Sequence, residues 1–236
     1  MKSLHIVQHT LSENLGALEG EFRQRGIGFQ YQKPLTAGKV PTSAVNSDGL
    51  ILLGGGAWGT HGERTILPSL DQELRFTYDH LKRNRPVMGF GLGAQIICIA
   101  AGGSTEQSAT RVHTGMARRV REGALHGHLP KHFPFVSFMR DRLVLPDDSE
   151  VLAVDEQGAP VVFTVGPDVI CMTCHPGTGP EMLRALAAEV KASDAELGEE
   201  FSFVDQHHSQ MMIALESMMH GIAAATGWLA SPDDFA

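Results

Sequence analysis

The segment Gly89-Phe90-Gly91-Leu92-Gly93 has the spacing of a turn that presents a catalytic nucleophile. A strand that ends in Gly-x-nucleophile-x-Gly before a helix holds the middle residue in a strained turn above the sheet, beside free N–H groups of the helix. The middle residue here is Gly91, which has no side chain that could attack a substrate. The pattern therefore predicts a turn of the kind that holds a catalytic nucleophile, but the nucleophilic side chain is missing.

His175 is the nearest candidate for acid–base chemistry, because it follows an apolar segment that reads as a strand at 169–173. We favour a hydrogen-bonded, partly buried histidine, and a surviving catalytic or binding role is the alternative. Strand alternation would place Cys171, Thr173 and His175 on one face and Cys174 on the other. Since the chain has no second cysteine pair, we expect no metal site there.

Two glycine turns follow predicted strands and are typical of anion sites. Gly54-Gly55-Gly56 follows a strand at 49–53, and Gly91 and Gly93 follow a strand at 86–90. Backbone N–H groups and the dipole of the helix after Gly93 favour a negative charge. The spacing is not the Gly-x-Gly-x-x-Gly of a dinucleotide site. We expect either a carboxylate or phosphate ligand, or a tight turn that the fold alone requires.

Alternating strands and helices in the first half must position these turns. Residues 10–13 form a capping box, which predicts a helix that starts there and stops at Gly26, with its apolar face formed by Leu11, Leu15, Leu18 and Phe22. The other predictions are strands at 4–7, 29–32, 49–53 and 86–90, and helices at 67–84 and 94–101. This order predicts an α/β fold with three layers and a doubly wound, mostly parallel sheet.

The second half reads as hairpins followed by helices. Short strands at 135–138, 142–145, 151–154, 160–165 and 169–173 are expected to pack beside the main sheet. Helices are expected from Pro180 to about Val190 and over roughly 203–228. In the last helix the pairs Met211/Met218 and Met212/Met219 are seven residues apart, which favours a core or dimer-forming face over soft-metal ligation. The segment 111–142 carries a local charge of +5, which indicates a solvated face or, alternatively, a surface that receives the acidic tail.

Several motifs together resemble the class I glutamine amidotransferases, particularly stand-alone members similar to the glutaminase part of GMP synthase. The motifs are Gly54-Gly55, Pro86-Val87-Met88-Gly89 with Gly-x-Gly-Ala-Gln ending at Gln95, Leu145-Pro146, and His175-Pro176 before Pro180-Glu181-Met182. The resemblance covers most of residues 4–190, and the order and spacing of the motifs make it specific. It implies the flavodoxin-like, three-layer fold of this family.

The resemblance also implies an amide hydrolysis that frees ammonia from glutamine, by a cysteine at the turn, a histidine, and a glutamate two residues later. This sequence keeps only His175, because Gly91 stands at the nucleophile position and Gly177 at the glutamate position. Cys98 lies seven residues beyond Gly91, about 10 Å along a helix, and cannot replace the nucleophile. The family's aromatic-His-x-Asp motif corresponds to residues 138–141, where the histidine is missing. The positions that the family would use to bind the ligand are Gly55, Gly56, Leu92 and Gln95, with oxyanion N–H donors near Gly55 and at Leu92.

Composition places the chain among compact globular proteins. It has 236 residues, 42% hydrophobic and 19% charged, with a net charge of −8 that does not indicate a nucleic-acid partner. No apolar run is long enough to predict a membrane span. Three cysteines and a strand-like start suggest a cytoplasmic setting without a signal peptide. We expect a family-like domain over 1–192 and an acidic, Met-rich helical extension over 193–236, packed on it or on a partner.

Three functions follow as hypotheses. The first is a pseudoenzyme that has lost glutaminase activity, needs no cofactor, and binds a small glutamine-like or anionic molecule or acts in regulation. The second is an active hydrolase in which His175 activates water or an unorthodox nucleophile. The third is an assembly subunit that uses the terminal helix to join a synthase or to form a homo-oligomer.

Overall fold

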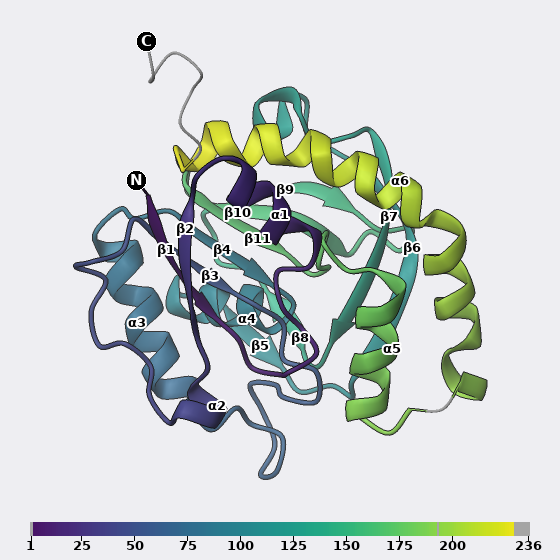
Figure 1. Cartoon of the computed structure of the whole chain (residues 1–236), viewed down its shortest axis with the longest axis horizontal. Helices are drawn as coiled ribbons and strands as arrows, with labels where there is room; N and C mark the ends of the chain where they lie inside the picture. The colour runs from purple at the N-terminus through teal and green to yellow at the C-terminus, as the bar shows by residue number, and fades with distance from the viewer. Residues whose placement is uncertain (1, 193, 229–236) are drawn as a thin grey trace.

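The computed structural model describes residues 2–192 and 194–228 and is built on a nine-stranded sheet with the order β2-β1-β3-β4-β11-β10-β9-β6-β7. Its first five strands run parallel (Figure 1). They are β1 (Ser3–Val7), β2 (Gly28–Gln32), β3 (Gly49–Leu52), β4 (Val87–Phe90) and β11 (Val169–Met172). β3, β4 and β11 are buried at every position, as expected for apolar strands covered on both faces. The predicted mostly parallel α/β fold is confirmed.

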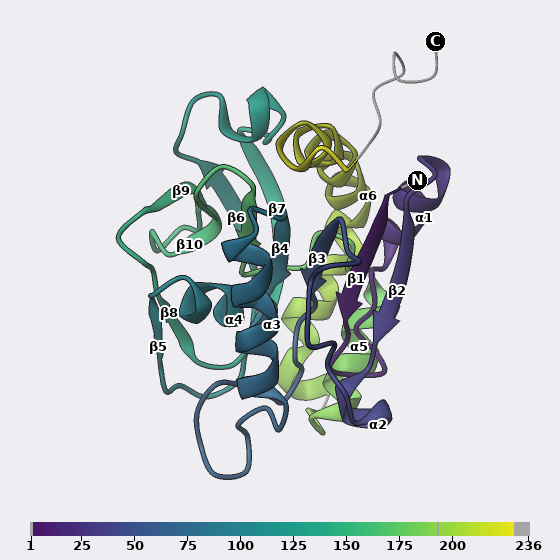
Figure 2. The same ribbon diagram turned by 90° about the vertical axis from the view of Figure 1, so that its left-hand side faces the viewer.

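Helices cover both faces of this sheet, as Figure 2 shows. On one face lie α3 (Leu70–Lys82) and α4 (Leu92–Ala100). On the other lie α1 (Ala17–Gln24), α5 (Pro180–Glu189) and α6 (Asp194–Thr226), while α2 (Pro34–Ala37) follows β2. Alternate residues of β3 serve the two cores, since Leu50 and Leu52 pack with α3 and α4, and Ile51 packs with α1.

The strands of the second half join the main sheet, so the expectation that they pack beside it was wrong. They are β6 (Arg111–Arg119), β7 (His132–Met139), β9 (Ser149–Val154) and β10 (Pro160–Val165), all antiparallel to their neighbours. β5 (Ser104–Glu106) and β8 (Arg142–Val144) form a small separate sheet. The long strand β6 was missed because it is only half-buried and mixes polar with apolar residues.

The N-terminal helix begins at Ala17, seven residues after the start predicted from the capping box. Thr10 Oγ1 does accept a hydrogen bond from Glu13 N, at 2.9 Å, but residues 10–16 form a loop. Leu11 is 75% exposed and lies on no helix face. The local pattern failed because the carboxylate of Glu13 turns into the protein interior. We refer to residues Thr10 to Gly16 as the plug loop.

α6 is longer than predicted and packs across β6, β7 and the short 3₁₀ turn η1 (Ala124–Gly127), along the top of Figure 1. Its residues Met211, Met218 and Met219 are buried in the cores, which confirms the core alternative for part of the methionine stripe. The basic segment is partly paired with acids of neighbouring elements, Arg121 with Glu150 and Arg142 with Glu106. No helix in the described part of the chain is long and apolar enough to cross a membrane. Residues 193 and 229–236 of the predicted extension lie outside the described residues.

Candidate functional site

The turn between β4 and α4 keeps the geometry that presents a nucleophile. Gly91 has φ 51° and ψ −112°, a conformation that a residue with a side chain adopts only under strain. Its N–H donates to Met172 O at 2.9 Å, which ties the turn to β11. A Cβ atom built on Gly91 would meet Phe138 O at 3.5 Å and Gly54 Cα at 3.6 Å, both ordinary contacts. Gly91 therefore has no side chain, but the turn that holds it and the space for a Cβ atom are present.

His175 is held by backbone atoms at both ring nitrogens. Nε2 lies 2.8 Å from Asn14 O, which can only accept, so Nε2 carries the proton. Nδ1 then accepts the N–H of Gly177 at 3.1 Å. The ring is 5% exposed and packs against Phe90 with centroids 4.7 Å apart. Burial lowers the pKa of His175 to about 4, so the imidazole is neutral at physiological pH and has no free nitrogen.

The chain itself fills the space beside Gly177, the predicted position of the missing glutamate. A Cβ on Gly177 would lie 2.5 Å from Leu15 O and 3.1 Å from His175 Cε1. Gly16 has φ 56°, and a Cβ there would collide with Gly177 O. Ala17 N donates to that same oxygen at 3.3 Å. The backbone of the plug loop therefore fills the space that a side chain at 177 would need.

Gly91 and His175 line one small, partly enclosed cavity. Its volume, measured as the space open to the centre of a water molecule, is about 10 Å³. That is close to the least that one buried water needs, so glutamine does not fit in this conformation. The other residues of the lining are Glu13, Val136, Phe138, Thr173, Cys174, Thr178, Leu183 and Leu186.

The cysteines near this cavity are poor nucleophiles. Burial raises the pKa of Cys174 to about 12, and Cys171 packs in the core on the opposite face of the sheet. The prediction that Cys171, Thr173 and His175 share a face was wrong, because β11 ends at Met172 and the alternation stops there. Within the described residues no three His, Cys, Asp or Glu side chains gather as metal ligands would.

Glu13 is a site residue that the sequence reading missed. Its side chain is buried, and Oε1 accepts the N–H of Gly54 at 3.1 Å, at the glycine turn after β3. Oε2 is buried and has no hydrogen-bond partner. Burial raises the pKa of Glu13 to about 7, against which the nearby His9 acts to lower it. The only sequence signal, a capping box, pointed to a helix start instead.

A buried ion pair supports the same glycine turn from behind. His9 Nδ1 donates to Leu53 O at 3.0 Å and Gly54 O at 3.1 Å, and Nε2 lies 2.7 Å from Glu73 Oε2. Ser69 Oγ donates to the other oxygen of Glu73 at 2.6 Å. Burial opposes the charge on His9, but the attraction of Glu73 and its hydrogen bond outweigh it, so the pKa of His9 is raised. A positive group therefore lies behind the turn that binds Glu13.

Gln95, predicted to contact glutamine, is fully buried and used within the protein. Its Nε2 donates to Arg140 O and, at 3.1 Å, to Asp141 O. Asp141 in turn accepts from Thr60 N at 2.8 Å and Ser108 N at 3.0 Å. The turn at Arg140 and Asp141 is thus fixed to α4 and to two loops.

The predicted backbone donors lie beside Glu13. Gly55 packs against the side chain of Leu92 so closely that a Cβ on Gly55 would collide with it. Gly56 has φ 56°, and a Cβ there would approach Thr10 Cγ2 of the plug loop to 3.0 Å. The two glycine turns and the plug loop therefore meet at one corner of the sheet.

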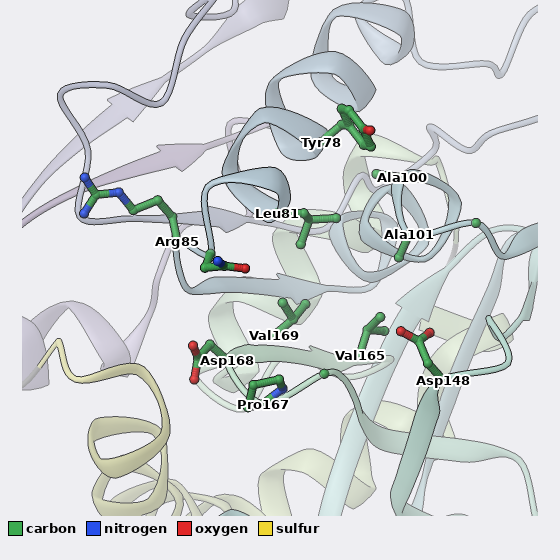
Figure 3. A pocket seen from close by; sticks show the side chains of 13 residues that line it. Tyr78, Leu81, Arg85, Ala100, Ala101, Asp148, Val165, Pro167, Asp168 and Val169 are labelled. Atoms are coloured by element: carbon green, nitrogen blue, oxygen red, sulfur yellow. The ribbon is translucent and has the colours of Figure 1, made fainter.

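A larger pocket than this cavity lies elsewhere. It has a volume of about 530 Å³ and is lined by residues such as Tyr78, Leu81, Arg85, Asp148 and Asp168 (Figure 3). It opens at the amino ends of β4 and β11, whereas Gly91 and His175 follow the carboxyl ends of these strands. Because ligands of open α/β sheets bind at the carboxyl ends, the corner around Gly91 is the candidate site.

The fold and this corner define a protein of the class I glutamine amidotransferase type, and the family model "Glutamine amidotransferase class-I" matches residues 12–183. The chain belongs to this family, which confirms the resemblance. The fold is similar to that of a glutamine amidotransferase from Thermotoga maritima, with 18% identity, a TM-score of 0.80, and 98% of this chain and 99% of that chain covered. A glutamine amido transferase from Methylobacillus flagellatus has 17% identity and a TM-score of 0.81, over 98% and 96% of the two chains.

A candidate GMP synthase subunit from Thermoplasma acidophilum is a more distant structural neighbour. It has 18% identity and a TM-score of 0.56, over 81% of this chain and 96% of that chain. No curated protein sequence matches the chain.

Proposed function

We propose that this class I glutamine amidotransferase-like protein does not hydrolyse glutamine through a cysteine and acts as a small-ligand-binding or regulatory pseudoenzyme. The observation that carries the proposal is the pairing of Gly91 with His175. The turn has no side chain to attack the amide carbon, and both nitrogens of the histidine are engaged by backbone atoms. Neither the nucleophile nor the base of the reaction is available.

The cysteines of the chain do not supply a substitute. A thiol attacks as its thiolate, and burial raises the pKa of Cys98 to about 11 and that of Cys174 to about 12. Activation of water by His175, the competing hydrolase hypothesis, would need Nδ1 to release the Gly177 N–H or Nε2 to release Asn14 O. The second change requires the plug loop, which carries Asn14, to move, and the first requires the turn at Gly177 to move.

The test is ammonia release from L-glutamine by the unmodified protein, Gly91→Cys and His175→Ala. We expect no release from any of them, because Gly91→Cys adds a thiol but leaves His175 engaged. Release by the unmodified protein contradicts the proposal, and its loss in His175→Ala would establish the water-based hydrolase. Calorimetric titration with L-glutamine and L-glutamate measures the binding half of the proposal, which requires saturable heat from at least one of them.

An assembly role is the second candidate, favoured by the likeness to the candidate GMP synthase component from Thermoplasma acidophilum. In this form of the proposal the predicted extension, residues 193–236, would meet a synthase or a second copy in the cytoplasm. Deleting α6 would uncover buried methionines, so a surface change is the sharper test. Ile213 is 67% exposed on α6, and Ile213→Lys should reduce any oligomer seen by light scattering. An unchanged oligomer would exclude this face.

A further inference from the structure

Glu13 makes a contact of the kind that a bound ligand would make. Its carboxylate meets the Gly54 N–H at the carboxyl end of β3 and lines the cavity shared by Gly91 and His175. The closeness is such that a Cβ on Gly54 would collide with both carboxylate oxygens. The second oxygen, Oε2, is buried without a partner. A buried carboxylate with an unused oxygen is costly, so the fold must hold it there by other contacts.

The plug loop supplies these contacts on both sides of Glu13. Before it, Ser12 N donates to Glu189 Oε1 at 3.0 Å and Ser12 Oγ donates to the same atom. After it, Leu15 N donates to Tyr31 Oη at 3.1 Å. Asn14 O accepts from His175 Nε2. The loop is fixed to α5, β2 and the turn after β11, and these contacts direct Glu13 inward.

The groups around Glu13 act on its charge in both directions. Burial, the largest effect, and Glu189 beyond the plug loop raise the pKa of Glu13, whereas His9 and the hydrogen bond from Gly54 lower it. The pKa of His9 is itself raised by Glu73, and His175, which lines the same cavity, is neutral. The Gly54 N–H and His9 are therefore the groups of this corner that favour a carboxylate.

We infer that the Gly54 corner is a carboxylate-binding site that the protein's own Glu13 occupies, and that an external carboxylate binds there by displacing Glu13 and the plug loop. This deepens the proposed function and rests on it, since it says what fills the ligand site of the resting protein and which chemical class competes for it. The plug loop is then a built-in competitor of the ligand.

The test removes the internal carboxylate and supplies an external one. Glu13→Ala keeps Cβ and removes Cγ and the carboxylate group, which together correspond to the heavy atoms of acetate. Sodium acetate should therefore raise the thermal unfolding midpoint of Glu13→Ala saturably, by on the order of 5 °C at high saturation, relative to sodium chloride at equal ionic strength. Propionate, which is one methylene longer, should bind more weakly. The unmodified protein should show no shift beyond the chloride control.

Two matched variants sharpen the result. Glu13→Gln retains the shape and can still accept from Gly54, so it should not respond to acetate. Glu181→Ala removes an exposed glutamate of α5 and should behave as the unmodified protein does. A response of equal size in all four proteins, or none in Glu13→Ala, would overturn the inference.

A second measurement does not depend on Glu13→Ala folding. In the unmodified protein the Gly54 amide proton resonance should move with pH as its acceptor titrates, and this movement should vanish in Glu13→Gln. A resonance that moves equally in Glu13→Gln would assign the effect to His9 and refute the inference. A resonance that does not move in the unmodified protein would also refute it. Ammonia release by the unmodified protein would refute the proposed function instead, so the two failures are distinct.

Discussion

Gly91 and Gly177, at which the sequence predicts missing catalytic side chains, lie in opposite kinds of surroundings. At Gly91 the turn, the neighbouring strand ends and the space for a Cβ all remain. At Gly177 the backbone of Leu15 occupies the space for a Cβ, and His175 is hydrogen-bonded to Asn14 O and Gly177 N. Gly91 therefore lies in a turn with room for a side chain, whereas Gly177 is packed against backbone. Two glycines that look alike in the sequence can thus differ in how much space surrounds them.

The largest effect should come from introducing a glutamate at Gly177. Gly177→Glu forces a Cβ into contact with Leu15 O and should destabilise the protein by about 3 kcal/mol or more, measured by urea unfolding. Gly20→Glu is the control, since nothing lies within 4 Å of a Cβ on Gly20 in α1. If Gly177→Glu lowers the free energy of unfolding by no more than Gly20→Glu does, then Gly177 is not packed against backbone as described.

The pH dependence of stability should separate Glu13 from His175. The folded pKa of Glu13, about 7, lies above its ordinary 4.5, so its contribution is present below pH 4.5 and is lost as pH rises to about 7. Relative to the unmodified protein, Glu13→Gln should therefore gain up to about 3 kcal/mol across this window. His175 has the opposite sign, because its folded pKa of about 4 is below 6.5 and its contribution is lost as pH falls from 6.5 to 4.

Urea unfolding at each pH measures how the free energy of unfolding of the two proteins depends on pH. If Glu13→Gln and the unmodified protein keep a constant difference from pH 4.5 to 7, then Glu13 is not buried as an acid in solution. The acid-side loss should persist in Glu13→Gln, since His175 is unchanged in that variant.

A smaller loss of stability is expected from substitutions at Gly91. Gly91→Ala meets no clash but must adopt φ 51°, which costs about 1–3 kcal/mol. Gly91→Cys should cost a similar amount and still fold. Thermal unfolding of both variants and of Gly177→Glu compares the stability lost at the two positions. A greater loss at Gly91 than at Gly177 would contradict our interpretation that Gly177 is the more tightly packed position.

The smallest effect should be at the outer surface of the plug loop. Leu11 is 75% exposed, so Leu11→Ser should change stability by no more than about 0.5 kcal/mol. If Leu11 instead packed on a helix face, as the capping box suggests, urea unfolding would show a loss several times larger.

The strands of the central sheet and the turn at Gly91 could be predicted from the sequence because the patterns that specify them are local. The apolar runs of β3 and β4 and the glycines around Gly91 dictate strand, turn and helix within a few residues. The favoured reading of His175 as a buried, hydrogen-bonded residue agrees with its environment for the same reason, since an apolar strand precedes it.

The rest of the site could not be predicted because its contacts join distant parts of the chain. Asn14 is 161 residues from His175, and Glu13 is 41 residues from Gly54. Nothing around residues 10–13 distinguishes a glutamate that caps a helix from one that turns inward. The half-buried strand β6 was missed on similar grounds, since its pairing with β7 and β9 decides its structure more than its own pattern does.

The close approach of Gly16 to Gly177 couples the two positions to each other. Each glycine leaves room for the other, and a side chain at either one meets backbone of the opposite segment. A side chain at 177 would thus require a coordinated change in the segment from Asn14 to Ala17. Neither position can accept a larger residue unless the opposite segment moves.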